Sequence, residues 1–399
     1  MTNKTLPDGW QWKKLGDGCQ INPPKSEVRN LEDCLVSFVP MADLKEKQKF
    51  FEYKQEKFLS EVYSGYTYFA ENDVLLAKVT PCFENGKSGI ARNLKNGKGF
   101  GSSEYYVLRG NENILKEWIY YTIANKSFLN LGAENMSGAV GLKRVTKDFL
   151  YNYPIPLPPL EEQKRIVAKI DAAFEQLDEA ISLQKNNILR TETLKKALLV
   201  EQFSELPYEK KKLGEIAEVK RGKSKHRPRN DKSLFGGKYP FIQTGDVRGA
   251  AKYITEYSET YNEKGLEQSK LWKKGTVCLT IAANIGEVTI LGIDACFPDS
   301  VVGIISSKNN NEFIYYYLTT LKTQLEAKAT QAAQMNLNVE KLVEFEIPLP
   351  PIAEQEKIVA YLDKSFAEID EMLEAQKTRL AHLEGMKKAI LQEAFEGKL

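Results

Sequence analysis

The sequence has few cysteines, few histidines and no excess charge of either sign, and each scarcity excludes a class of protein. Its five cysteines are scattered over 399 residues without a Cys-x-x-Cys pair, which argues against a disulfide framework and a zinc cluster. Two histidines are too few for most histidine-based catalytic triads and zinc hydrolase sites. Lysine and arginine total 56 against 54 acidic residues, so affinity for an anionic polymer requires a local basic patch.

No segment has the pattern of a signal peptide or a membrane span. Residues 1–14 lack an apolar core. The most apolar stretch, Val277–Phe297, contains acidic residues, glycines and many β-branched side chains, which is typical of buried strands. Together with the unpaired cysteines, these features predict a soluble protein of the reducing cytoplasm.

An internal repeat is the strongest pattern in the chain. Residues 155–206 align without a gap on residues 347–398, at an offset of 192, and 23 of the 52 aligned positions are identical. Both copies begin with Ile-Pro-Leu-Pro-Pro, and Lys-Lys-Leu-Gly occurs upstream in each half. The chain is therefore predicted to be a duplication of a variable domain followed by a repeated segment. The predicted boundaries are 1–153 and 207–345 for the variable domains, and 154–206 and 346–399 for the repeated segments.

Each repeated segment predicts one long helix. Residues 160–205 contain neither proline nor glycine, and residues 352–396 contain only Gly385. A helix of about 44 residues is roughly 65 Å long and needs a partner to bury its apolar face. Apolar residues recur in steps of four and three, which is the period of a coiled-coil seam. The predicted seam consists of Ile170, Phe174, Leu177, Ile181 and Gln184 in the first copy, and Leu362, Phe366, Ile369, Leu373 and Gln376 in the second.

The two helices predict the architecture of the whole chain. The first must connect the variable domains, so a second helix that pairs along its length runs in the opposite direction. We expect an antiparallel coiled coil with a pseudo-twofold relation between the halves, which keeps two similar domains a fixed distance apart. The equivalent glutamines in the seam are expected to fix the helix register. An ordinary amphipathic helix packed on its own domain is the alternative.

Both variable domains have an α+β pattern. Short β-rich runs occupy residues 73–79, 104–109, 276–293 and 300–306. Helical patches follow at Ile114–Leu129 and Glu312–Lys328, near the end of each domain.

The second variable domain has the densest basic segment, Lys220–Arg229. It contains six lysines or arginines and no acid, and its glycine and proline indicate a loop. Such a segment suits contacts with phosphates and arginine hydrogen bonds to guanine edges, whereas a solvated surface loop is the alternative. The residues predicted to bind DNA here are Arg221, Lys223, Lys225, His226, Arg227, Arg229, Gln243, Thr244 and Arg248.

The first variable domain has a sparser set of the same kind. Basic and polar residues occur near its start and in the segment Lys78–Arg92, where glycine and proline indicate turns. Ordinary turn residues between two strands are the alternative. The residues predicted to bind DNA are Lys25, Arg29, Lys78, Thr80, Asn85, Lys87 and Arg92.

Three motifs resemble catalytic signatures without completing them. Ile21–Pro24 resembles the Asn-Pro-Pro-aromatic signature of amino-group DNA methyltransferases, but Lys25 stands at the aromatic position and no glycine-rich cofactor loop follows a strand. The Gly-Lys-Ser strings at 86–88 and 222–224 lack the upstream glycine of a phosphate-binding loop. We expect no catalytic residue and no metal site in this chain.

The two-domain plan and the repeated Ile-Pro-Leu-Pro-Pro-x-x-Glu-Gln-x-x-Ile-Val signature resemble the specificity subunit of Type I restriction-modification systems. The signature lies at residues 155–167 and 347–359, and Gln-Met-Asn-Leu-Asn precedes the second copy at Gln334–Asn338. The resemblance covers essentially the whole chain. The first half departs from it, because Gly141–Val145 stands opposite Ala333–Leu337.

The resemblance implies a non-enzymatic reader of double-stranded DNA, with one target-recognition domain for each half of a bipartite, asymmetric sequence. It implies two methylation subunits that bind S-adenosylmethionine and methylate adenine N6, and restriction subunits that use ATP and Mg. None of these cofactors is expected in this chain. A two-headed coiled-coil adaptor that binds proteins instead of DNA is the alternative.

Overall fold

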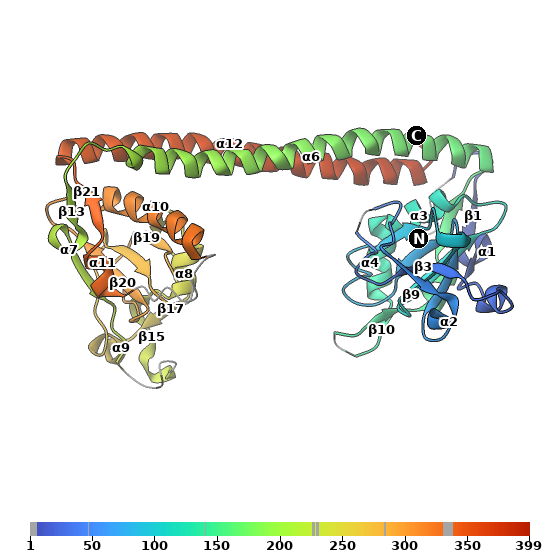
Figure 1. Ribbon diagram of the computed structural model, residues 1–399, viewed down its shortest axis with the longest axis horizontal. Coiled ribbons are helices and arrows are strands. Elements are labelled where there is room, and N and C mark those ends of the chain that lie inside the picture. The colour runs from blue at the N-terminus through green and yellow to red at the C-terminus, as the bar shows by residue number, and fades with distance from the viewer. Residues whose placement is uncertain are drawn as a thin grey trace. The chain divides into compact units, whose positions relative to one another are not determined.

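The computed structural model describes residues 6–46, 48–139, 141–225, 228, 231–282, 285–329 and 338–399. The chain divides into two compact units, one made of residues 1–185 and 378–399 and the other of residues 186–377. The division crosses both long helices, so each unit contains one variable domain and part of each helix (Figure 1).

Two four-stranded sheets form the first variable domain. The first sheet is antiparallel, in the order β2 (Cys19–Ile21), β9 (Tyr105–Gly110), β6 (Val74–Ala77) and β7 (Ser88–Ile90). The second has the order β4 (Gln55–Phe58), β3 (Leu35–Val39), β8 (Lys98–Gly101) and β5 (Thr67–Ala70), with β3 and β8 parallel. The helices are α1 (Leu15–Gly18), α2 (Leu59–Val62), α3 (Lys116–Ala124), α4 (Lys126–Glu134) and α5 (Lys147–Asn152), with 3₁₀ turns η1 (Lys25–Val28) and η2 (Lys95–Gly97).

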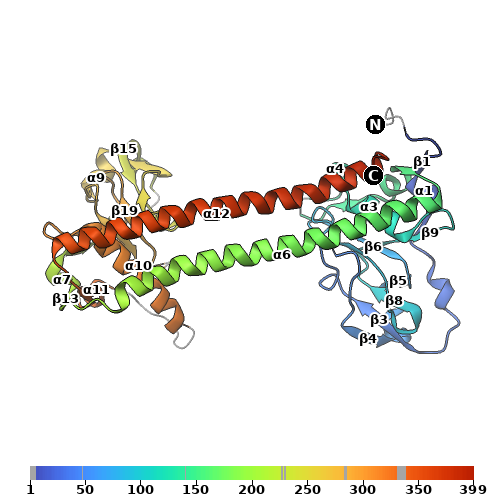
Figure 2. The ribbon, with the colours of Figure 1, turned by 90° about the horizontal axis from the view of Figure 1, so that it is seen from above.

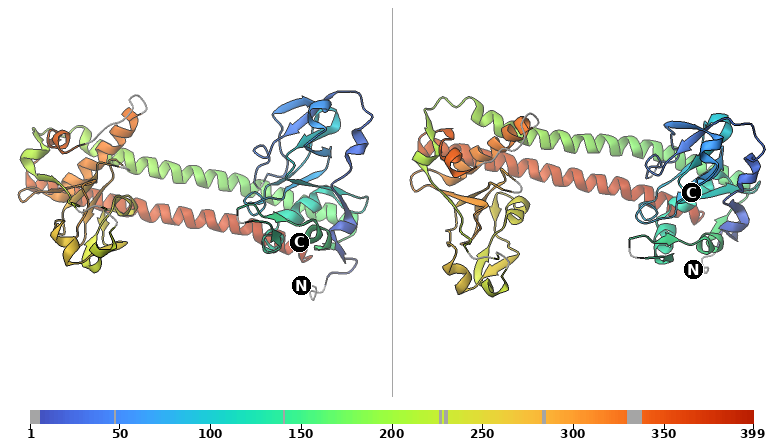
Figure 3. Two further views of the ribbon diagram at one scale, coloured as in Figure 1. Left: turned by 90° about the horizontal axis from the view of Figure 1, so that it is seen from below. Right: turned by 60° about the horizontal axis from the view of Figure 1, so that its bottom comes forward.

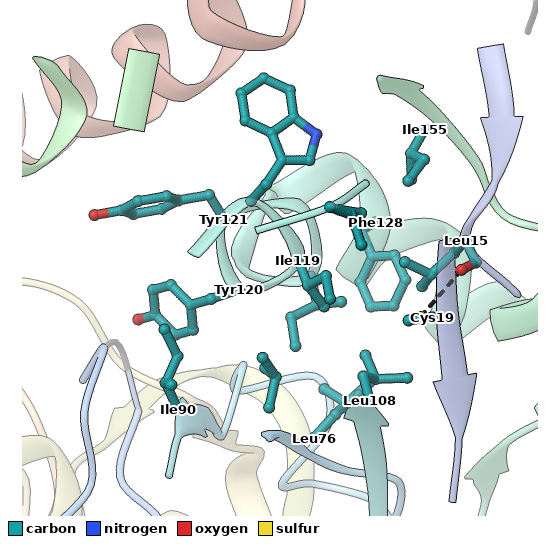
Figure 4. Close-up of a cluster of buried hydrophobic side chains, with 14 of the residues drawn as sticks. Leu15, Cys19, Leu76, Ile90, Leu108, Ile119, Tyr120, Tyr121, Phe128 and Ile155 are labelled. Carbon is teal, nitrogen blue, oxygen red and sulfur yellow. Dashed lines mark hydrogen bonds between the residues drawn. The ribbon is translucent and has the colours of Figure 1, made fainter. Parts of the chain in front are cut away.

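The largest buried cluster of this domain lies between α3 and the first sheet. All four residues of β6 are buried, which explains why its sequence is continuously apolar instead of alternating. Figure 4 shows Leu76 and Leu108 of the sheet near Ile119 of α3 and Phe128 of α4. Cys19 lies at the edge of this cluster, where its thiol donates a hydrogen bond to the carbonyl of Leu15, and burial raises its pKa to about 12.

The second variable domain repeats the first sheet with one strand added. Its five strands have the order β14 (Glu218–Arg221), β20 (Val301–Ile305), β18 (Val277–Thr280), β19 (Val288–Leu291) and β16 (Tyr253–Ile254). Strands β15 (Phe235–Phe241) and β17 (Glu259–Tyr261) form a separate ribbon. The helices are α7 (Leu213–Ile216), α8 (Thr244–Gly249), α9 (Glu263–Glu267), α10 (Asn311–Ala329) and α11 (Val339–Val343), with the 3₁₀ turn η3 (Lys232–Leu234). Helix α10 packs on β18 and β19 as α3 packs on β6 and β7.

The first predicted helical patch is helical, but it is divided into two elements. The patch Ile114–Leu129 forms two helices, because Asn125 between α3 and α4 has an extended backbone, with ψ of 134°. Its side-chain oxygen accepts a hydrogen bond from the N–H of Ser127 and caps α4.

The two repeated motifs pair with each other in both halves. Strand β1 (Gln11–Lys14) lies antiparallel to β12 (Pro154–Leu157), with Lys13 opposite Ile155. Strand β13 (Lys210–Lys212) lies antiparallel to β21 (Glu346–Pro348), with Lys211 opposite Ile347. The Lys-Lys-Leu-Gly string therefore holds the Ile-Pro-Leu-Pro-Pro segment that leads into each long helix.

The long helices α6 (Leu160–Ser204) and α12 (Ile352–Phe395) are antiparallel in each unit (Figure 2). In the first unit the ammonium of Lys387 lies 2.6 Å from the carboxylate of Asp178. In the second unit the lysine belongs to α6 and the aspartate to α12, and the ammonium of Lys195 lies 2.5 Å from the carboxylate of Asp370. The same ion pair therefore recurs in both units with the roles of α6 and α12 reversed, so the predicted antiparallel pairing and internal repeat are confirmed.

The predicted seam residues differ in how far their side chains are buried between the two helices. Gln376 donates from Nε2 to the hydroxyl of Thr191 across the helices, at 3.1 Å. The buried positions are Ile170, Leu177, Ile181, Gln184, Leu362, Ile369 and Leu373, whereas Phe174, Phe366 and Gln376 are half-buried.

None of the helices in the described residues is both long and apolar enough to cross a membrane.

Candidate nucleic-acid interface

A buried glutamine fixes each variable domain to the start of a long helix. Gln163 of α6 accepts a hydrogen bond from the N–H of Leu115 and donates to the carbonyls of Asn113 and Pro158, all at 2.9 Å. Gln355 of α12 occupies the same position in the second unit, where it accepts from the N–H of Asn310. The Glu-Gln pair of the repeated signature is therefore a docking feature of the fold.

A lysine, an aspartate and a tyrosine form a second duplicated contact. In the first unit, Asp171 of α6 accepts hydrogen bonds from the hydroxyl of Tyr121 and from Lys49, whose ammonium lies 2.6 Å away. Burial is the main cause of the raised pKa of Tyr121, and the bond to Asp171 adds to it. In the second unit, Lys252, Tyr316 and Asp363 make the same contacts. These clusters orient each domain on the helix that follows it.

Hydrogen bonds and ion pairs fix the chain around Lys25, near the start of domain 1. Asn22, which has a positive φ of 58°, accepts a hydrogen bond from the N–H of Val107 at 3.0 Å. Arg109 forms a bidentate pair with buried Asp73 and also binds Glu27 of η1. Because the side-chain oxygen of Asn22 is bound to the backbone of β9, this Asn-Pro-Pro segment serves to hold the local fold.

Two predicted lysines lie at one pocket in domain 1. Lys25 and Lys78 line a pocket of about 350 Å³ together with Tyr66, Thr67 and Ser103. The ammonium of Lys78 donates to the carbonyl of Ser103 at 2.8 Å. Tyr66, Thr67 and Ser103 were not among the predicted residues; the run Tyr63–Phe69, which contains three tyrosines, is the sequence signal for an aromatic surface near the first two of them.

The other predicted residues of domain 1 have separate surroundings. Thr80 donates to Glu84, and Lys87 donates to the carbonyl of Met41. The guanidinium of Arg92 lies 4.2 Å from the centre of the Phe50 ring, next to Lys49 of the helix-docking cluster. Arg29 and Asn85 are exposed.

In domain 2, the start of the basic segment alternates between exposed and buried residues. Arg221, Lys223 and Lys225 are exposed, whereas Gly222 and Ser224 between them are buried. A Cβ at Gly222 would lie 2.3 Å from the carbonyl oxygen of Phe297, so only glycine fits. This alternation places the three cations on the exposed side of the segment, as in an extended chain, where such neighbours are about 6.6 Å apart.

The other described residues that were predicted to bind DNA in domain 2 lie near the stretch of chain that also binds the basic segment. Residues 223 and 242 donate their N–H groups to the carbonyls of Phe297 and Cys296, so the basic segment and the turn before α8 flank one stretch of chain. Gln243 donates from Nε2 to Glu259 at 2.7 Å, Thr244 begins α8, and Arg248 is exposed on that helix. The predicted His226, Arg227 and Arg229, together with Gln334 and Asn336 of the upstream motif, are outside the described residues.

The family comparison matches both halves of the chain. The family model described as "Type I restriction modification DNA specificity domain" matches residues 7–190 and again residues 205–381. Each match includes one variable domain and most of the long helix that follows it.

Individual proteins and a solved structure show the same similarity. The EcoAI specificity subunit of Escherichia coli is 40% identical over 178 residues, which are 44% of this chain and only 29% of that relative. The MjaVIII specificity subunit of Methanocaldococcus jannaschii is 24% identical over 99% of this chain and 94% of its own. A chain in a structure that reports the complex assembly and conformational transition of the type I R-M system is 26% identical, with a TM-score of 0.84 over 99% of this chain and 100% of that one.

Proposed function

Since this chain belongs to the Type I restriction-modification DNA specificity family, we propose that it is the DNA-recognition subunit of a Type I restriction-modification complex. Residues 1–153 and 207–345 are the two target-recognition domains, and each reads one half of a bipartite, asymmetric sequence. Segments 154–206 and 346–399 set the spacing between the half-sites. The observation that carries the proposal is the family match in both halves, each of which contains exposed basic residues.

In the proposed complex, different residues contact the phosphates and the bases of the DNA. The exposed cations Arg221, Lys223 and Lys225 follow the sugar-phosphate backbone, because their charges lie on one side of an extended segment. In domain 1, Lys25 and Lys78 meet a phosphate at the pocket, where Tyr66 offers an aromatic surface. The side chains of Gln243, Thr244 and Arg248 are the polar groups for base edges in domain 2.

The chain itself is proposed to be non-catalytic, and its partners carry the chemistry. Two methylation subunits bind S-adenosylmethionine and transfer methyl groups to adenine N6, and restriction subunits use ATP and Mg to cleave unmethylated DNA in the cytoplasm. Support comes from the similar chain in a structure that concerns the assembly of a type I R-M complex. The buried amides, ion pairs and basic segments described above suit binding and positioning.

A mobility-shift assay tests the proposal against the adaptor alternative. The chain is mixed with duplex DNA alone, and then together with its methylation subunits, in the presence of excess competitor DNA. Sequence-selective binding that requires the methylation subunits is the expected result. Equal affinity for every duplex, with or without these subunits, would contradict the proposal and favour a protein-binding adaptor.

A further inference from the structure

A short β-hairpin extends from the first variable domain beside the pocket. Strands β10 (Met136–Ser137) and β11 (Arg144–Val145) pair antiparallel, and the structure describes the connecting loop except for residue 140. In the right-hand view of Figure 3, and at the label β10 in Figure 1, the hairpin projects from the body of its domain.

The base of the hairpin is fixed by several contacts. Arg144 forms a bidentate pair with Glu104, at 2.7 and 2.8 Å, which lowers the pKa of that carboxyl group. The carbonyl of Lys143 accepts a hydrogen bond from the N–H of Thr80, and the N–H of Val145 donates to the carbonyl of Lys78. Because Lys78 also lines the pocket, the base of the hairpin is anchored next to the pocket.

Between its two strands the hairpin carries an exposed apolar side chain next to one lysine. Leu142 is 56% exposed, although large apolar side chains are normally covered, and Lys143 beside it is also exposed. No acidic residue occurs between Met136 and Val145. Gly138 and Gly141 have positive φ values of 123° and 84°, which permit the tight turn that presents these side chains.

We propose that this hairpin enters a groove of the DNA, where Leu142 contacts base edges and Lys143 contacts the adjacent phosphate. The inference rests on the proposed function and assigns a specificity-determining residue to the first domain. An apolar side chain in a groove discriminates through the thymine methyl group or by wedging between base steps. The contacts that fix the two strands of the hairpin favour such insertion, because little conformational entropy is then lost when the hairpin enters the groove.

The hairpin lies where the sequences of the two halves of the repeat depart from each other. Gly141–Val145 stands opposite Ala333–Leu337 in the repeat alignment, so the two halves differ in chemistry at this position. A position that contacts bases is expected to differ between domains that read different half-sites. The docking residues of the long helices, such as Gln163 and Gln355, are by contrast identical.

The test measures methylation by the full chain in complex with its methylation subunits. The substrate is a DNA library in which each base pair of the mapped recognition sequence is varied in turn. Leu142→Ala is expected to reduce discrimination about fivefold or more at one or two adjacent base pairs of one half-site. Leu142→Met, which keeps the apolar bulk, is the matched control and should retain the wild-type profile. The other half-site serves as an internal control, because domain 2 is unchanged.

A second variant separates phosphate contact from base contact. Lys143→Gln should weaken binding similarly for every sequence and lower the slope of log K against log salt by about 1. If Leu142→Ala gave the wild-type profile at every position of both half-sites, the hairpin inference would be wrong while the proposed function stood. If the wild-type complex showed no sequence preference, the proposed function would fail, and this inference with it.

Discussion

The exposed cations at the start of the domain 2 basic segment are the residues whose DNA role is simplest to test. Replacing Arg221, Lys223 and Lys225 together with alanine removes three charges from one side of an extended segment. The slope of log K against log salt should fall by about 2 to 3, because each phosphate contact releases close to one counterion. Binding of the complex to duplex DNA between low and physiological salt gives this slope.

The matched control removes three exposed lysines elsewhere in the same domain. Lys273, Lys274 and Lys308 are exposed, and their replacement changes the net charge by the same amount. This control should leave the slope close to that of the unmodified chain. Equal slopes for the two triple variants would remove the basic segment from the interface.

The ion pair between domain 1 and α6 gives a stability prediction. Asp171→Asn leaves Lys49, whose side chain is only 18% exposed, without its anionic partner. Because the Asp171 side chain is itself 42% exposed, solvent screening limits the cost to about 1 kcal/mol, or roughly 2–4 °C in melting temperature. Calorimetry measures the shift, with the exposed Glu175→Gln on the same helix as control. Identical melting temperatures for the two variants would show that the pair contributes nothing.

The residue types of the candidate site were predictable from the sequence, but the contacts that each residue makes were not. The glutamine of the repeated signature was visible as a repeat, yet its partners Asn113 and Leu115 lie about 50 residues earlier. The prediction grouped Arg92 with the basic residues of its loop, whereas the structure stacks it on Phe50. Such contacts depend on nonlocal folding, which the local pattern of a single sequence does not encode.

At the scale of elements, Gln163 joins α6 to domain 1. Gln163→Leu leaves the N–H of Leu115 and two carbonyls without their partner in a buried site, at a cost of about 2–3 kcal/mol. The melting temperature of the first unit should fall by several degrees. Gln176→Leu, at an exposed position of the same helix, should have almost no effect. A similar small effect for both would contradict the docking role.

The helix pair provides a second prediction at this scale. Removing one heptad at equivalent positions, residues 181–187 of α6 and 373–379 of α12, keeps the 3.5-residue apolar period, removes the two seam glutamines Gln184 and Gln376 together, and shortens each helix by about 10 Å. The tolerated gap between half-sites should shrink by about three base pairs, or methylation should be lost if the domains no longer match the DNA helix. Methylation sequencing of the variant complex measures the gap. An unchanged gap would show that the helices do not set the spacing.

The elements themselves were largely predictable, and their pairing was not. Proline-bounded, proline-free segments with a 3.5-residue period predicted α6 and α12 almost to the residue, because a long helix is a local property. The pairing of β1 with β12 and of β13 with β21 joins segments more than 130 residues apart, which periodicity alone does not reveal. The break at Asn125 was missed because a single capping side chain decides it.

At the scale of the whole molecule, the duplication separates what is kept from what varies. The identical residues of the repeat include those that dock each domain on the helices and those that pair the helices: Gln163, Asp171, Phe174, Asp178 and Lys195, with their equivalents 192 residues later. The variable domains share the arrangement of their first sheets but differ in their basic segments. One common scaffold that carries two different sets of basic residues suits the asymmetric target of the proposed function.

Mapping N6-methyladenine across the genome of cells that express this chain with its methylation subunits tests the central claim most directly. The account predicts one non-palindromic motif, made of two defined half-sites separated by a fixed number of unspecified base pairs, and its disappearance when the chain is deleted. A palindromic or uninterrupted motif, or methylation that persists without the chain, would contradict it.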